Sequence, residues 1–317
     1  MDALNLAAAR LRNLLQSGLL VAGMGALLGY LAWILGGPFL SLLAIVLALG
    51  TWVATPLLSP TLVLRIFGGR PIAPAASPQL YAIVEALTER AGLGTLPRLY
   101  YVPSDVMNAF AVGDRDHSVV ALSDGLLRRL SLEELAGVLA HEVSHISNHD
   151  LRVMSFADLI ERFTRLLSLL GQLLLLISLP LLLFSDYRID WLAIAVLIFA
   201  PSINALGRLA LSRNREFNAD LEAARLLGRP EPLARALAKM ERFQGRVLER
   251  FIGPGERLPD PSLLRTHPPT EERIRRLLAL TERPQHPPLV PGAWERSPGL
   301  LASAPLRPRW HRNGLWY

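Results

Sequence analysis

Two histidines flank a glutamate in the sequence His141-Glu142-Val143-Ser144-His145. Residues four apart share one face of a helix, so the imidazoles of His141 and His145 can converge on one metal ion. Glu142 follows the first histidine directly, where its carboxylate can act as general base toward a water on that ion. The spacing predicts metal-assisted hydrolysis, and a solvated polar helix face is the alternative.

A catalytic zinc takes three protein ligands, and the chain has no cysteine to supply one. His149 lies eight residues from His141, about 12 Å along a straight helix, so we predict that it is a surface residue. Glu216 and Asp220 share one helix face further along the chain. Glu216 is therefore the candidate third ligand, and Asp220 can accept the ring N–H of a ligand histidine. Taken alone, the two carboxylates also fit a solvated helix face.

The elements that must position these residues are predicted from local signals. Ser131 and Glu134 form a capping box that opens a helix reaching about residue 149. Three short apolar runs predict a small sheet. The predicted strands are residues 99–102, 109–112 and 118–122. Further helices are predicted at residues 78–91, 213–227 and 270–280.

The composition indicates a membrane protein, because 51% of the residues are hydrophobic and only 19% are charged. No charged residue occurs between Arg12 and Arg65, and a Gly-Gly-Pro sequence at 36–38 divides this stretch into two lengths that can each cross a bilayer. The four predicted spans are residues 15–35, 39–59, 166–185 and 191–207. The last is short, which leaves a re-entrant or groove-lining helix as an alternative.

Arginines predict the orientation of the spans, because positively charged flanks stay in the cytoplasm. These flanking residues are Arg10, Arg12, Arg65, Arg70, Arg162, Arg165, Arg208, Arg213 and Arg215. All polar segments should then face the cytoplasm. The net charge of +6 is scattered along the chain and does not predict nucleic-acid binding.

Several motifs in this order resemble those of the HtpX-type membrane zinc metalloproteases, relatives of the CAAX prenyl proteases. The resemblance covers about residues 1–280. Its motifs are the N-terminal hairpin, residues 108–113, residues 139–145 with Asp150, a second hairpin, residues 212–220, and Thr266-His267-Pro268-Pro269-Thr270-Glu271-Glu272-Arg273.

The resemblance implies roles for individual residues. Glu216 would be the third zinc ligand, Asp220 its supporting residue, and His267 a group that stabilises the transition state. The substrate backbone would lie along the edge strand formed by Asn108, Ala109, Phe110, Ala111 and Val112. The chain departs from the family in its Pro/Arg/Trp-rich tail and in His149, so neither receives a role.

We therefore predict a mostly helical α+β chain, a polytopic membrane protein with about four transmembrane helices and a zincin-like (gluzincin) peptidase domain. The predicted parts are a transmembrane hairpin (1–64), a first peptidase segment (65–165), a second hairpin (166–207), a second peptidase segment (208–283) and an extension (284–317). One Zn²⁺ per chain would serve an endopeptidase of the bacterial cytoplasmic (inner) membrane that cleaves damaged membrane proteins at the cytoplasmic face.

Two other functions fit parts of the sequence. An intramembrane protease would place its histidines in an apolar span, whereas Glu133, Glu134, Asp150 and Arg152 flank this motif. A non-enzymatic membrane scaffold would not need Glu142. The sequence specifies neither the cleavage preference nor an oligomeric state.

Overall fold

The long uncharged stretches form helices in the computed structural model, which describes residues 3–54, 64, 68–183, 190–252, 269–280 and 286–289. Three helical stretches in this part of the chain are long and apolar enough to cross a membrane. They are Leu14–Ala54, Asp150–Pro180 and Trp191–Leu227. They belong to helices α1 (Ala3–Ala54), α6 (Asp150–Leu183) and α7 (Trp191–Leu227).

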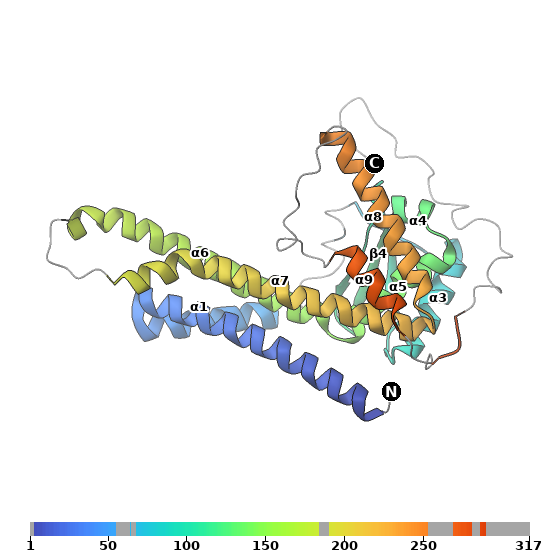
Figure 1. Ribbon diagram of the computed structural model, residues 1–317, viewed down its shortest axis with the longest axis horizontal. Helices are drawn as coiled ribbons and strands as arrows, with labels where there is room; N and C mark the ends of the chain where they lie inside the picture. Colours follow the sequence, from blue (N-terminus) through green and yellow to red (C-terminus); the bar gives the residue numbers. More distant parts are fainter. Residues whose placement is uncertain are drawn as a thin grey trace. The chain divides into compact units, whose positions relative to one another are not determined.

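Helix α1 consists of two arms, because the backbone leaves the helical conformation at Gly36 and Gly37. Gly37 has φ 67°, a conformation that favours glycine. A Cβ on Gly29 would lie 3.3 Å from the Ile45 side chain, so the two arms pack against each other (Figure 1). The predicted hairpin is thus present up to Ala54, and residues 55–59 of its second span lie outside the described residues.

Helices α6 and α7 are longer than the sequence predicted. The second hairpin was expected to begin at residue 166, but α6 already begins at Asp150. The sequence predicted a span at 191–207 and a separate helix at 213–227. In the structure both belong to α7, which continues through residues 208–212 without a break. Charged side chains do not end a helix, and no proline or glycine lies between Arg208 and Leu227 to do so.

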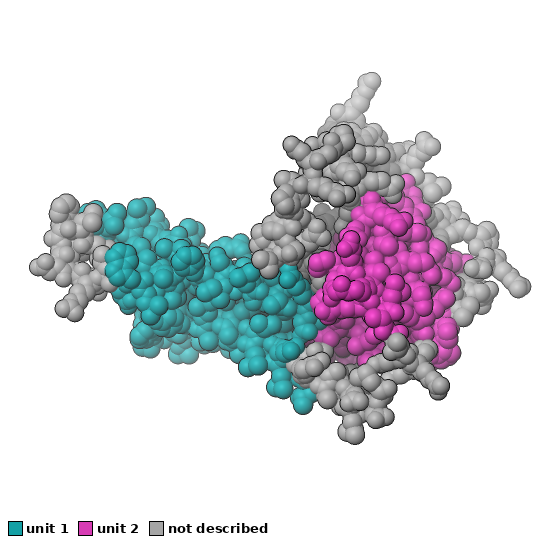
Figure 2. All heavy atoms as spheres, viewed as in Figure 1, with its two compact units in different colours: residues 1–57, 152–214 teal, residues 58–151, 215–317 magenta. Residues whose placement is uncertain are grey.

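The chain consists of two compact units, residues 1–57 with 152–214 and residues 58–151 with 215–317 (Figure 2). The first unit is helical, and a cluster including Met24, Leu28, Ile160 and Leu211 joins α1, α6 and α7. It also contains buried polar contacts. Asn204 donates a hydrogen bond to Thr164 Oγ1 at 2.7 Å.

The second unit contains a sheet of β1 (Arg70–Pro71), β2 (Arg98–Val102), β3 (Ala109–Gly113) and β4 (Ser118–Ser123). The strand order is β1-β2-β4-β3, with β2 parallel to β4 and the other pairs antiparallel. The three predicted strands are confirmed as β2, β3 and β4. Every residue of β4 is buried, whereas β3 lies at the edge of the sheet.

Helices cover this sheet and build the core of the second unit. They are α3 (Pro78–Arg90), α4 (Asp124–Arg129), α5 (Leu132–Ser147), α8 (Glu231–Ile252) and α9 (Thr270–Leu278), with a 3-10 turn η2 at Pro74–Ala76. Helix α5 packs against β3, α3 and α8, and α8 packs against α9. The core also includes Leu289, a residue of the predicted C-terminal extension, whose N–H donates to Leu227 O at 2.9 Å.

The start of α5 is fixed by the predicted capping box of Ser131 and Glu134. The Glu134 carboxylate also pairs with Lys239 of α8 at 2.7 Å. A second contact between these helices lies at Gly137, where a Cβ would come within 2.7 Å of Leu233 N. The backbones of α5 and α8 therefore approach as closely as a glycine allows.

Candidate active site

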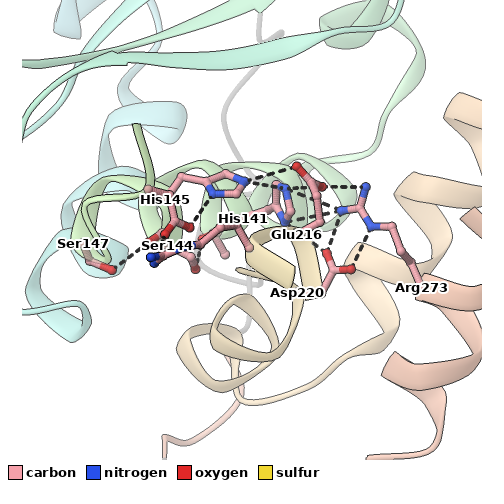
Figure 3. A network of polar contacts seen from close by, with 10 residues as sticks. His141, Ser144, His145, Ser147, Glu216, Asp220 and Arg273 are labelled. Atoms are coloured by element: carbon pink, nitrogen blue, oxygen red, sulfur yellow. Dashed lines mark hydrogen bonds and ion pairs between the residues drawn. The ribbon is translucent and has the colours of Figure 1, made fainter. Parts of the chain in front are cut away.

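His141 and His145 lie one turn apart on α5, and Glu216 of α7 faces them (Figure 3). The two Nε2 atoms are 3.1 Å apart. Glu216 Oε2 lies 3.5 Å from His141 Nε2, and Glu216 Oε1 lies 3.7 Å from His145 Nε2. The structure thus brings together three side chains that are up to 75 positions apart in the sequence (216 − 141).

These three residues fit a metal ion. Each offers one ligand atom, and the atoms all lie within 4.8 Å of one another. In a tetrahedral zinc site with bonds of about 2.0–2.1 Å, neighbouring ligand atoms are about 3.3 Å apart. The observed separations of 3.1, 3.5 and 3.7 Å lie close to that value. Two imidazoles and one carboxylate are also the donor set of known catalytic zinc sites.

Each histidine is held by a further carboxylate through its Nδ1 atom. Asp220 Oδ1 lies 3.0 Å from His141 Nδ1, and Asp150 Oδ2 lies 2.8 Å from His145 Nδ1. Such contacts fix the ring orientation and leave Nε2 for a metal. Arg215 donates to the other oxygen of Asp150 at 2.7 Å.

Arg273 of α9 binds the other two acidic residues of the site. Its guanidinium donates to both oxygens of Asp220 at 2.7 and 2.8 Å, and Nη1 lies 3.1 Å from Glu216 Oε2. Burial lowers the pKa of Arg273, but the hydrogen bond and charge of Asp220 outweigh burial and raise it, so the guanidinium stays charged. Arg273 thus positions Glu216 and Asp220 together.

The electrostatic field at His141 favours positive charge. Burial opposes the charged imidazolium and lowers the pKa of His141. Hydrogen bonds with Asp220 and Glu216 outweigh this effect and raise the pKa to about 10. The same carboxylates that stabilise an imidazolium are suited to stabilise a metal cation.

A pocket of about 160 Å³ opens beside these residues. Glu142 lines it together with His141 and Glu216. Within the described part of the chain the Glu142 carboxylate makes no hydrogen bond or ion pair, although the residue is only 8% exposed. Asn108 and Ala109 also line the pocket, so the start of β3 lies at its wall.

Comparisons with known proteins agree with this geometry. A family model described as peptidase family M48 matches residues 74–281. The chain belongs to peptidase family M48.

Curated relatives are similar over almost their whole length. A protein named "Protease HtpX homolog" from Acaryochloris marina is 36% identical over 87% of this chain and 94% of the relative. One of the same name from Thermococcus kodakarensis is 35% identical over 84% of this chain and 96% of the relative. The crystal structure of S. mikatae Ste24p has a similar fold, with TM-score 0.50 and 18% identity over 84% of this chain and 65% of that chain.

Membership of family M48, the convergent donor set and the apolar helices together identify a multi-pass membrane metalloprotease. The predictions of a hydrolase, of an α+β zincin-like fold and of the HtpX-type family are thereby confirmed. His267, for which the resemblance implied a catalytic role, lies outside the described residues.

His149 lies at the surface of the M48 domain, as predicted. Its φ of 57° ends α5 and turns the chain into α6, so that Asp150 points back to His145. The sequence did not predict a role in the metal site for Asp150, Arg215 or Arg273. The family motifs contained Asp150 and Arg273, and this was the only sign in the sequence that these two residues belong to the site. The motifs did not indicate what either residue does.

Replacing a carboxylate behind a histidine should weaken metal binding in this M48 protein. We expect Asp150→Asn and Asp220→Asn each to lower zinc affinity by about 10- to 100-fold, because the ring loses its orienting acceptor. Competition with a chelator of known affinity measures this. Asp105→Asn is the control, because Asp105 pairs with Arg128 and Arg129 away from the site. Wild-type affinity in both site variants would contradict the assignment.

Proposed function

We propose that this M48 protein is a zinc-dependent endopeptidase that cleaves damaged membrane proteins at the cytoplasmic face of the bacterial cytoplasmic membrane. The observation that carries the proposal is the convergence of His141, His145 and Glu216, which would hold the ion. When bound, zinc supplies a Lewis acid and lowers the pKa of water toward neutrality.

Glu142 would act as general base in this reaction. Its carboxylate lines the same pocket as His141 and Glu216, so it can accept the proton of the attacking water and pass it to the leaving amine. Asp150 and Asp220 would keep the two imidazoles oriented. Arg273 would hold Glu216 and Asp220 while remaining charged. We retain His267 as a proposed donor to the oxyanion that forms on the scissile carbonyl.

The substrate backbone would pair with β3. Ser123 N–H donates to Asn108 O and Asn108 N–H donates to Ser123 Oγ, so both main-chain polar groups of Asn108 point toward β4. This direction alternates along an antiparallel strand, so the N–H groups of Ala109 and Ala111 point away from β4. An extended peptide can add to such an edge through main-chain hydrogen bonds, beside the pocket that Asn108 and Ala109 line.

Ala109→Pro should raise KM for a peptide substrate by about 2- to 10-fold, the worth of one hydrogen bond. The substitution removes an N–H that makes no ladder bond. Steady-state kinetics at measured zinc content test this. Phe110→Pro is the matched comparison, because its N–H faces β4, and we expect it to lower the melting temperature instead. Unchanged KM in Ala109→Pro would argue against substrate binding on β3.

The cytoplasmic orientation is a separate part of the proposal, supported by the arginines that flank the apolar helices. Alkaline phosphatase fused after Gly37 or near Arg188 should be active, because that enzyme works only on the far side of the membrane. A fusion after Gly228 should be inactive. Activity after Gly228, or inactivity at both loops, would contradict the proposed topology.

The activity itself is tested with the full chain in detergent. Purified protein with equimolar zinc should fragment an unfolded membrane protein, and a chelator should stop the reaction reversibly. A scaffold would bind the substrate and leave it intact.

A further inference from the structure

One face of α8 lines the pocket. Leu233, Leu237 and Glu241 follow one another at intervals of four residues and therefore lie in one row. Met240 lies beside this row, and Val138 of α5 lines the same pocket. Four apolar side chains and one carboxylate thus line the pocket beside its metal-ligand residues.

Burial decreases along this row. Leu233 is 1% and Leu237 7% exposed, whereas Met240 and Glu241 are half-buried. The inner part of the wall is therefore apolar, and the carboxylate lies toward its more exposed end. A cavity of about 150 Å³ holds a benzene molecule, so a pocket of about 160 Å³ has room for one side chain of medium length.

Glu241 makes no hydrogen bond or ion pair within the described part of the chain. The two acidic residues at the start of α5 differ in this respect, because Glu134 pairs with Lys239 and Glu133 pairs with Arg229 and Arg235. Arg273 also lines the pocket, but Asp220 and Glu216 already bind its guanidinium. Among the described residues, the carboxylate of Glu241 therefore remains available to a cation that enters the pocket.

We infer that this pocket binds a lysine or arginine side chain of the substrate, at a position next to the scissile bond, with Glu241 pairing with its charged end. The inference rests on the proposed function and specifies its substrate class. Lysine and arginine bury an aliphatic stem and keep a charged end near water. Leu233, Leu237, Met240 and Val138 fit the stem, and a carboxylate fits the charged end through charge-assisted hydrogen bonds. An acidic side chain would meet Glu241 as a like charge.

The test uses peptides that differ at one residue on either side of a single cleavable bond, carrying lysine, norleucine or glutamate. Norleucine keeps the stem of lysine and lacks its charge. The wild-type protein should cleave the lysine peptide with kcat/KM about 10-fold or more above the norleucine peptide. Glu241→Gln should bring this ratio close to one, and Glu241→Lys should shift the preference to glutamate. Glu231→Gln, at an exposed residue of α8 that does not line the pocket, should keep the wild-type ratio.

Binding of the same peptides to a Glu142→Gln protein, followed by fluorescence anisotropy, gives a second ratio that needs no hydrolysis. A lysine preference that Glu241→Gln removes supports the inference in either measurement. If wild-type protein hydrolyses none of the peptides, the proposed function fails, and the binding ratio still decides about the pocket. The inference is overturned if the wild-type protein cleaves or binds the norleucine and lysine peptides equally well, or if Glu241→Gln leaves their ratio unchanged. Neither result would contradict the protease function.

Discussion

Glu142→Gln is expected to lower kcat by about 10²- to 10⁴-fold while the protein keeps its zinc. This factor is the usual contribution of a general base. The amide has nearly the shape of the carboxylate but cannot accept the proton of the attacking water. Because Glu142 makes no ion pair within the described residues and is not one of the three ligands, the site should otherwise keep its geometry. Single-turnover kinetics with metal analysis measures both quantities.

Glu133→Gln is the matched control for this experiment. Glu133 lies on the same helix, and its carboxylate pairs with Arg229 and Arg235 rather than lining the pocket. We expect its kcat to stay within about twofold of wild type, as for a surface charge. Near-normal turnover in Glu142→Gln would mean that another group takes the proton.

Removal of any one metal ligand should abolish both zinc binding and hydrolysis. His141→Ala, His145→Ala and Glu216→Ala each leave two of the three donors, and a catalytic zinc with an open position needs three. Metal analysis after gel filtration should fall from one zinc per chain to near zero. His149→Asn is the control, because that histidine is exposed at the turn after α5 and asparagine also adopts its φ of 57°. If Glu216→Ala keeps zinc and His149→Asn loses it, the third ligand has been assigned wrongly.

Local signals predicted much of the site. The capping box starts α5, and helical spacing then puts His141 and His145 on one face without any tertiary information. The same spacing of four residues predicted that Glu216 and Asp220 lie on one face of α7. What local spacing could not supply was the distance between the two helices.

The features that sequence analysis missed depend on tertiary contacts or on single backbone angles. Asp150 reaches His145 because His149 adopts φ 57°, which a non-glycine residue adopts only rarely. The role of Arg273 depends on the packing of α9 beside α7, which no local pattern encodes. Helix α8 was not predicted from the sequence. Leu237 and Glu241, which lie on α8 and line the pocket, were therefore not recognised as site residues.

The close approach at Gly137 has a consequence for how selectivity can change. Because α5 and α8 meet there through main-chain atoms, their spacing at this point is set by the backbone and not by Met240 or Glu241 further along α8. Exchanging residues on the exposed end of α8 would therefore alter which substrates fit, while the helix that carries His141 stays where it is. In the proposed mechanism α5 carries the general base and two of the metal ligands, whereas α8 selects a substrate side chain, so α5 can remain constant while α8 diversifies.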